Sequence, residues 1–163
     1  DMTSNSSDVL MLERYTGSGE WKSTPYLTSP TAEDALRFSP DGKWVRFVSN
    51  ESGKSELYVQ PFTGAGTGLK DARSGRQQIS TGGANGSGWW SRDGKEIRFI
   101  NHDSQIMSVE VHTEPTFSVS APKMLASFKE LKIRDFSFAP DGRVMVILQG
   151  DGESANRIDL VVN

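Results

Sequence analysis

A short block built around Asp-Gly occurs three times in this chain, each time between two runs of strand-forming residues. An Asp-Gly pair in that setting is a strong hairpin signal, because Gly adopts positive φ and Asp accepts hydrogen bonds from its own turn. Each block therefore predicts an antiparallel hairpin. The blocks read FSPDGK (38–43), WSRDGK (90–95) and FAPDGR (138–143), and their turn residues are Asp41, Gly42, Asp93, Gly94, Asp141 and Gly142.

The blocks start at residues 38, 90 and 138, which gives spacings of 52 and 48 residues. A repeat of this length with four predicted strands is typical of the blades of a β-propeller. We therefore predict an all-β fold, a partial β-propeller of about three to four four-stranded antiparallel blades. The expected strands are 9–12, 21–27, 35–38, 44–48, 56–61, 77–80, 88–90, 96–100, 106–111, 123–128, 135–138, 144–149 and 157–162.

The repeats divide one domain into four segments. Residues 1–34 are expected to hold a half blade, its third and fourth strands, after a loose N-terminus. Residues 35–84 and 85–130 are two full blades, and residues 131–163 are a third blade that lacks its fourth strand. Both ends fall inside a blade, which favours part of a longer propeller over a ring closed by two copies or by the chain's own ends. Open blade edges also predict a homodimer, because unpaired strand edges associate.

Composition narrows the classes of function. The chain has 163 residues, no Cys and a net charge of −3. Disulfides and thiolate chemistry are excluded, and the acidic balance argues against nucleic acid as a partner. No stretch approaches the ~20 apolar residues of a membrane span, so we expect no membrane insertion by this segment. The absence of Cys leaves the compartment open, and a periplasmic or other extracytoplasmic location is slightly favoured over the cytoplasm.

The three repeats extend over the strings FSPDGKWVRFVSNESGKSELYVQPF (38–62), WSRDGKEIRFINHDSQIMSVEVH (90–112) and FAPDGRVMVIL (138–148). These strings resemble the repeats of TolB-type β-propellers. More narrowly, their order is similar to the C-terminal propeller behind the kinase domain of many bacterial serine/threonine protein kinases. The resemblance implies an interaction or sensor module. The chain departs from the pattern in an insertion at 64–76, in Arg92 where the repeat usually has Pro, and in its end at Asn163.

The sequence gives little material for catalysis. It contains no kinase motifs and no Gly-x-Ser-x-Gly elbow, and the Gly-rich segment 64–70 fits no phosphate-binding spacing. The three turn carboxylates are expected to cap their turns rather than hold a metal. His102 and Asp103 form the one His-carboxylate cluster, and His112 ends a strand, so we expect solvated side chains there. We therefore predict no catalytic residue, no metal and no cofactor.

A binding surface follows from the topology. The Asp-Gly turns should lie at one end of every sheet, and the loops before the first strand and after the second should lie at the other end. We call that other end the rim. Its side chains differ between repeats whereas the turns recur, as recognition on a constant frame requires. The predicted rim residues are Asp34, Asn50, Glu51, Asn85, His102, Asp103, Arg134 and Asp135, and Trp89 is added because it replaces Arg37 and Ser137 of the other repeats.

Trp89 has two interpretations: it faces a ligand or the channel, or it packs against a neighbouring blade. The predicted function is a non-catalytic propeller module that binds a protein partner or a small ligand, in a larger bacterial receptor-like kinase. The alternatives are a periplasmic TolB-like scaffold and a propeller that gates a peptidase.

Overall fold

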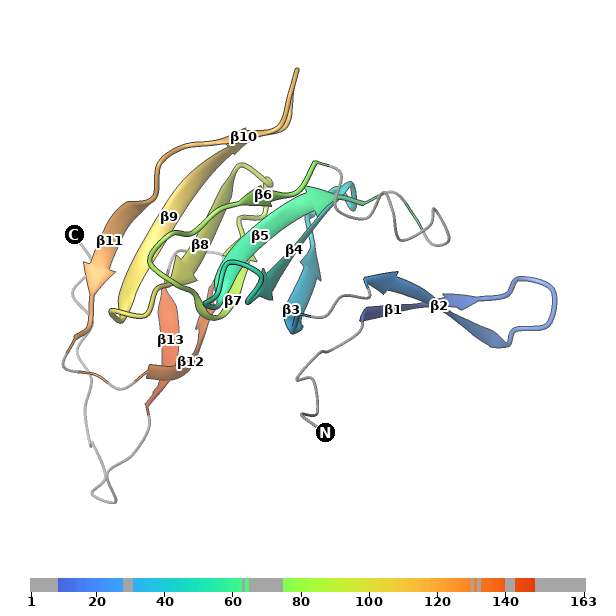
Figure 1. The fold of residues 1–163 in the computed structure, drawn as a ribbon, viewed down its shortest axis with the longest axis horizontal. Helices are drawn as coiled ribbons and strands as arrows, with labels where there is room; N and C mark the ends of the chain where they lie inside the picture. Colours follow the sequence, from blue (N-terminus) through green and yellow to red (C-terminus); the bar gives the residue numbers. More distant parts are fainter. Residues whose placement is uncertain are drawn as a thin grey trace. The chain divides into compact units, whose positions relative to one another are not determined.

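The computed structural model describes residues 9–27, 31–62, 64, 75–129, 131, 133–139 and 143–148, and in these residues it contains strands and turns (Figure 1). Every strand pair is antiparallel. The chain divides into two compact units, residues 1–83 and 84–163. Within the described ranges no helix has the length and apolar character of a membrane span. The all-β prediction is confirmed.

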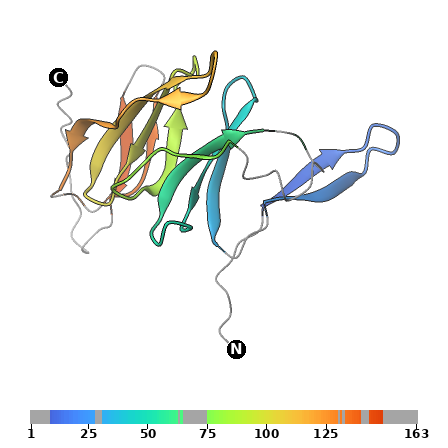
Figure 2. The ribbon, with the colours of Figure 1, turned by 45° about the horizontal axis from the view of Figure 1, so that its top comes forward.

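Unit 1 contains a four-stranded sheet in the order β3-β4-β5-β6, which we call blade 1 (Figure 2). Its central strands β4 and β5 are buried at nearly every position, including Val45, Phe47, Leu57 and Val59. Burial on both faces explains why these strands carry apolar residues at adjacent positions and not only in alternation. The strands are β3 (Glu33–Phe38), β4 (Trp44–Ser49), β5 (Glu56–Pro61) and β6 (Gln77–Gln78).

Unit 1 also contains a two-stranded sheet of β1 (Val9–Arg14) and β2 (Trp21–Leu27). Val9 and Met11 pack against a buried cluster that includes Phe47. The alternate residues Leu10 and Leu12 are 54% and 62% exposed, because successive side chains of a strand point to opposite faces. One face of this hairpin is therefore part of the core, and the other is apolar and uncovered among the described residues.

Unit 2 contains the second full blade, which we call blade 2. β9 pairs with β8 on one edge and with both β10 and β11 on the other, so the fourth strand is split in two. The sequence predicted only the second piece. Pro122 lies between the pieces and has no N–H to continue the ladder. The strands are β7 (Asn85–Trp90), β8 (Glu96–Ile100), β9 (Gln105–His112), β10 (Ser118–Val119) and β11 (Lys123–Ser127).

The last described sheet pairs β12 (Ile133–Phe138) with β13 (Val144–Leu148). Val144 and Val146 pack against a cluster that includes the buried ring of Phe136, whereas Met145 and Ile147 are 76% and 54% exposed. The predicted strand at 157–162, the N-terminal residues 1–6 and the turn residues Asp141 and Gly142 lie outside the described residues.

The first two Asp-Gly turns are held by the same hydrogen bonds. In blade 1 the Ser39 hydroxyl donates to Asp41 Oδ1 at 2.5 Å and accepts the Trp44 N–H at 3.0 Å, while Asp41 Oδ1 accepts the Lys43 N–H at 3.1 Å. Gly42 has φ of +71°, the left-handed conformation that favours Gly. Blade 2 repeats the pattern with Ser91, Asp93, Lys95, Glu96 and Gly94.

The third hairpin is paired one residue out of step with the other two. In the first two hairpins, the aromatic residue before the turn pairs with the residue seven positions later in the chain, as in Phe38–Val45 and Trp90–Ile97. In the third hairpin it pairs with the residue six positions later, as in Phe138–Val144. Ala139 replaces the serine and has no hydroxyl to accept a strand N–H. Its own N–H instead donates to the Arg143 carbonyl, whereas the Ser39 N–H donates to Trp44. The shift determines which face of β13 is buried.

We expect Ser39→Ala to lower the free energy of unfolding by about 1 kcal/mol at pH 7, because it removes two hydrogen bonds from a partly exposed turn. The pKa of Asp41 is lowered, first by the Ser39 hydroxyl and then by the Lys43 N–H. A lowered pKa stabilises the fold while the carboxylate is ionised, so this contribution is complete at neutral pH and is lost as the pH falls below about 4.

The measurement is urea unfolding of wild type and Ser39→Ala at pH 7 and pH 3. The difference between them should be smaller at pH 3, because part of the stability linked to the ionised Asp41 carboxylate is lost there, while the bond to the Trp44 N–H is kept. An equal difference at both pH values would show that the Ser39–Asp41 bond adds no pH-dependent stability.

Candidate functional site

In blade 1 the rim residues lie at the end of the β3–β4 hairpin opposite the Asp-Gly turn. Asp34 lies near the start of β3, opposite Val48, and Asn50 and Glu51 directly follow β4. Asp34 and Asn50 are exposed, and the Glu51 side chain is 23% exposed. The antiparallel pairing therefore gathers them at one end of a single sheet.

Hydrogen bonds from the rim side chains fix the local backbone. Asn50 Oδ1 accepts the Ala32 N–H at 3.1 Å and joins the entry of β3 to the β4–β5 turn. Asp34 Oδ1 accepts the N–H of Ala35, which has φ of +56° at a register shift between Asp34 and Arg37. A bulge with positive φ at a residue other than Gly is strained, and such features recur beside functional sites.

Arg76 joins this end of blade 1 and was missed by the sequence analysis, which treated residues 64–76 as an insertion. Its side chain is 6% exposed, and its Nη1 forms an ion pair with Glu51 Oε2. Its Nε donates to Gln60 Oε1 at 3.1 Å, and its guanidinium carbon lies 4.6 Å from the Phe47 ring centroid. A guanidinium stacked on an aromatic ring and paired with a carboxylate is well stabilised. Glu51 therefore presents a carboxylate whose charge is balanced within the blade.

In blade 2 the corresponding end holds Asn85, His102 and Asp103. Asn85 begins β7 opposite Ile100, and its Nδ2 donates to the Asn101 carbonyl at 3.2 Å. The buried Asn101 side chain accepts the Asp103 N–H, which shapes the β8–β9 turn and leaves the side chains of His102 and Asp103 exposed. This end of blade 2 therefore combines an amide, an imidazole and a carboxylate where blade 1 has two carboxylates and an amide.

Trp89 lies at the other end of β7, opposite Arg98. Its ring centroid is 4.7 Å from that of Phe136 and 5.8 Å from that of Phe138, both in β12. The structure thus places Trp89 in the aromatic contact between β7 and β12, the packing that we weighed against a ligand contact. Arg134 and Asp135 lie in β12, but their side chains are outside the described ones.

A cavity of about 500 Å³, lined mostly by charged and polar residues, opens at the Asp-Gly end of blade 2, away from the rim. Carboxylates, two lysines and His112 line it, and the pKa of Glu96 in its wall is lowered, first by hydrogen bonds from Arg98. In the described part of the chain no His, Asp and Glu residues cluster closely enough to hold a metal ion. The lining residues are Asp93, Lys95, Glu96, Ser108, Glu110, Val111, His112, Lys123 and Leu125.

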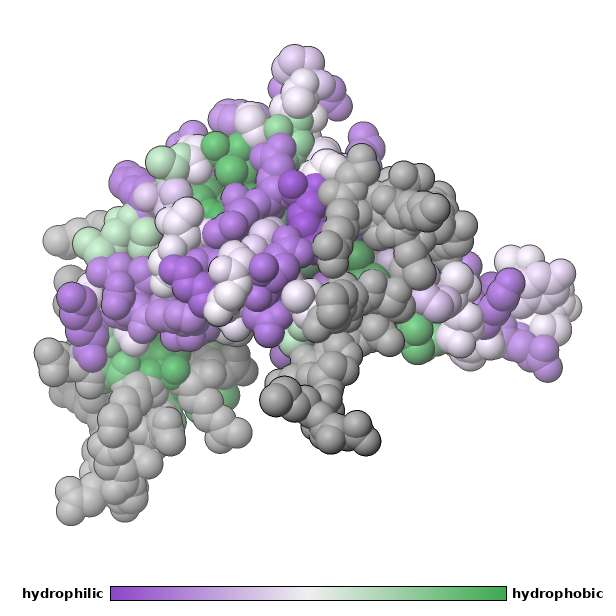
Figure 3. Space-filling model, in the orientation of Figure 1, coloured by the Kyte–Doolittle hydropathy of each residue, from purple (hydrophilic) through white to green (hydrophobic). Residues whose placement is uncertain are grey.

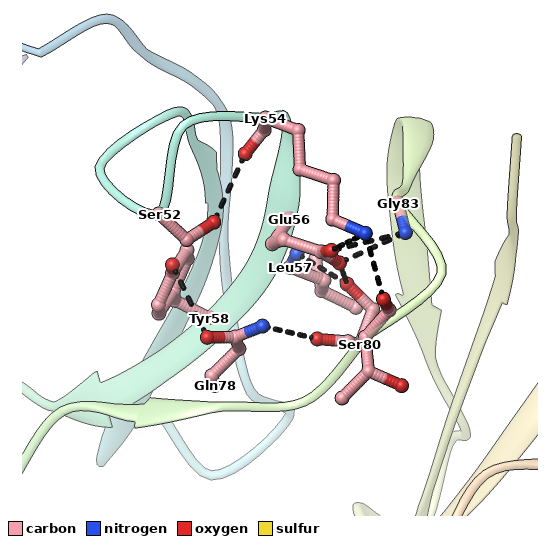
Figure 4. A network of polar contacts seen from close by, with 9 residues as sticks. Ser52, Lys54, Glu56, Leu57, Tyr58, Gln78, Ser80 and Gly83 are labelled. Atoms are coloured by element: carbon pink, nitrogen blue, oxygen red, sulfur yellow. Dashed lines mark hydrogen bonds and ion pairs between the residues drawn. The ribbon is translucent and has the colours of Figure 1, made fainter.

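A buried carboxylate in β5 holds the segment after β6 (Figure 4). Glu56 is fully buried, and both of its oxygens lie 3.1 Å from the Gly83 N–H. The Ser80 hydroxyl donates to Glu56 Oε2, and Lys54 Nζ lies 3.3 Å from Oε1. Ser80 Oγ also accepts the Leu57 N–H at 2.8 Å. The carboxylate is well satisfied, so its role here is structural.

We expect Glu56→Ala to lower the free energy of unfolding by about 3 kcal/mol, because the donors that surround the carboxylate lose their acceptor in a buried place. The exposed Glu110→Ala variant is the control and should change stability by less than about 0.5 kcal/mol. Denaturant unfolding of both variants measures the difference, and similar losses would contradict the role given to Glu56.

Comparison with protein-family models finds no match, and comparison with curated proteins finds none either. Solved structures do match. The alignment with a candidate 6-phosphogluconolactonase from Bacteroides uniformis covers 85% of this chain and 40% of the lactonase chain, with 18% sequence identity and a TM-score of 0.54. Oligogalacturonate lyase from Vibrio parahaemolyticus aligns with 83% and 34% at 14% identity, with a TM-score of 0.53. TolB from Acinetobacter baumannii aligns with 84% and 42% at 16% identity, with a TM-score of 0.45.

The chain spans less than half the length of these structures. At this identity the likeness concerns the fold. The likeness to the first two structures, whose TM-scores exceed 0.5, and the antiparallel blades define the chain as a partial β-propeller, as the repeats predicted.

Proposed function

We propose that this propeller segment is a non-catalytic module that binds a protein partner or a small ligand through its rim. One observation carries the proposal: in both full blades, the same hydrogen-bonded turn closes one end of the first hairpin, whereas the other end carries different exposed polar side chains. A constant frame with variable ends is how scaffolds distribute recognition. Arg134 and Asp135 in β12 complete the proposed rim.

The resemblance to the propellers of bacterial serine/threonine kinases supports a place in a larger receptor-like protein. A TolB-like periplasmic scaffold and a propeller that gates a peptidase are the alternatives. The parent gene separates the three: an upstream kinase domain supports the first, a signal peptide without a kinase supports the second, and a hydrolase domain with a Gly-x-Ser-x-Gly elbow supports the third.

Site-specific photo-cross-linking tests the rim. A benzophenone side chain at His102 should give a discrete cross-linked product in bacteria that express the parent protein. The same side chain at Arg92, exposed in the turn at the opposite end of blade 2, is the matched control and should give none. Equal products from both positions, or none from His102 or from an Asn50 variant, would contradict a binding role for the rim.

We further propose that a second copy of the chain covers the open end hairpins. In the described residues the sheets β1–β2 and β12–β13 have two strands each, and both carry an exposed apolar face. Figure 3 shows hydrophobic surface over β12 and β13. A groove of about 260 Å³ beside Leu10, Leu12 and Phe38 adds to the uncovered apolar surface of unit 1. Uncovered strands and apolar faces favour association.

Light scattering after gel filtration, over a range of concentrations, should show a dimer. Leu12→Lys should give monomers, because it places a charge on the exposed face of β1, which dimerisation would bury. Tyr15→Lys is the control, since Tyr15 is 64% exposed but lies in the β1–β2 turn, and it should leave the dimer intact. A monomer of the unaltered chain at all concentrations would overturn this proposal without affecting the proposed rim.

A further inference from the structure

Arg46 in β4 is a buried cation with no anionic partner among the described residues. The residue is 2% exposed, and the ion pairs of the described residues do not include it. Its Nη1 donates to the Ala35 carbonyl at 3.0 Å, but its Nε is buried with no hydrogen-bond partner. Buried guanidinium groups are normally paired, so this one calls for an explanation.

The same position in blade 2 shows what is missing. Arg98 of β8 aligns with Arg46, four residues after the turn glycine in each repeat. Glu96 Oε1 accepts from Arg98 Nε at 2.9 Å, and Oε2 accepts from Nη2 at 2.8 Å. In blade 1 the position of Glu96 is occupied by Trp44. Arg46 therefore lacks the carboxylate that its counterpart binds, and the unbonded Nε belongs to the edge of the guanidinium that Glu96 uses.

A second guanidinium adds positive charge at this place. Arg37 in β3 lies directly opposite Arg46 in the sheet, so both side chains are on the same face. Arg37 is exposed, and its Nη1 donates to its neighbour's carbonyl, that of Leu36, at 2.8 Å. Burial, and then the charge of Arg37, lower the pKa of Arg46 to about 9. An anion between these groups would relieve both effects.

We propose that Arg37 and Arg46 form a binding site for a carboxylate ligand on blade 1. The ligand's two oxygens take the place that the Glu96 side chain has in blade 2, on the Nε and Nη2 edge of Arg46. Arg37 provides the exposed contact through which the carboxylate arrives. A planar carboxylate fits this edge because the guanidinium fork presents two parallel N–H donors. The proposal rests on blade 1 alone and does not depend on the rim.

The structure also explains why Arg46 stays oriented for such a ligand. The strained Ala35, with φ of +56°, directs its carbonyl at Nη1. This bond fixes the opposite edge of the guanidinium, so the Nε edge does not have to be ordered when a ligand binds. Preorganised donors bind more tightly than mobile ones because less entropy is lost.

Titration of the arginine Nε–Hε signals by NMR tests the proposal. The full chain is titrated with citrate, with a hexaglutamate peptide and with inorganic phosphate at constant ionic strength. We expect a saturable shift of the Arg46 signal with citrate or with the peptide. A shift with citrate and not with the peptide would identify a free acid as the source of the carboxylate. A shift with the peptide and not with citrate would identify an acidic protein segment. A response to phosphate as strong as that to both carboxylate probes would overturn the assignment to carboxylates.

Three variants sharpen the test. Trp44→Glu should place a carboxylate where blade 2 has Glu96, occupy Arg46 from within, and weaken probe binding at least about tenfold, the worth of one charged hydrogen bond. Arg46→Gln should do the same by removing the site, with binding then read from the Arg37 Nε–Hε signal, and it keeps the test decisive if Trp44→Glu does not fold. Arg98→Gln is the matched control and should leave the affinity unchanged. No saturable shift in the unaltered chain, or equal binding by Arg46→Gln, would overturn the proposal.

Discussion

The hydroxyl of the turn serine sets the pairing on which the first two blades depend. Ser39 Oγ is bonded to a carboxylate on one side and to the N–H of the first residue of β4 on the other, so the start of that strand is fixed relative to β3. Since side chains alternate along a strand, a shift of one residue would exchange the buried and exposed faces. The serine hydroxyl and the apolar pattern of β4, in which Val45 and Phe47 are buried, therefore favour the same register.

The buried charged groups of blade 1 differ in how far partners from the same unit satisfy them, and three groups show this. Glu56 is buried and surrounded by donors from the segment after β6, and Arg76 is paired with Glu51 across the insertion. Among the described residues, the hydrogen-bond partner of Arg46 is the Ala35 carbonyl. The first two groups tie distant parts of the sequence to β5 and its neighbours, whereas the third leaves positive charge unbalanced. Glu56 and Arg76 therefore stabilise the fold, whereas Arg46 has donors that remain available for the proposed ligand.

The sequence could predict what depends on local patterns. The hairpins, the central strands and the ends of each sheet at which Asp34 and His102 lie follow from turn residues and strand alternation, and the structure has them there. Other features could not be predicted in this way. Arg76 contacts Gln60 and Phe47, and Glu56 accepts a hydrogen bond from Gly83, so these contacts join residues 16 to 29 positions apart. The split of the fourth strand of blade 2 depends on one proline. Contacts of this kind leave no periodic pattern.

The out-of-step third hairpin gives β13 an unusual property. Its five residues, Val144 to Leu148, are all aliphatic or Met, so either alignment with β12 presents apolar side chains to both faces. In β4 and β8 an arginine at the centre of the strand makes the two faces unequal, but β13 has Val146 there. The strand thus carries almost no information about its own alignment. That information comes from the turn, where Ala139 stands in place of serine, so a single polar residue gained on either face of β13 would choose the alignment for the whole hairpin.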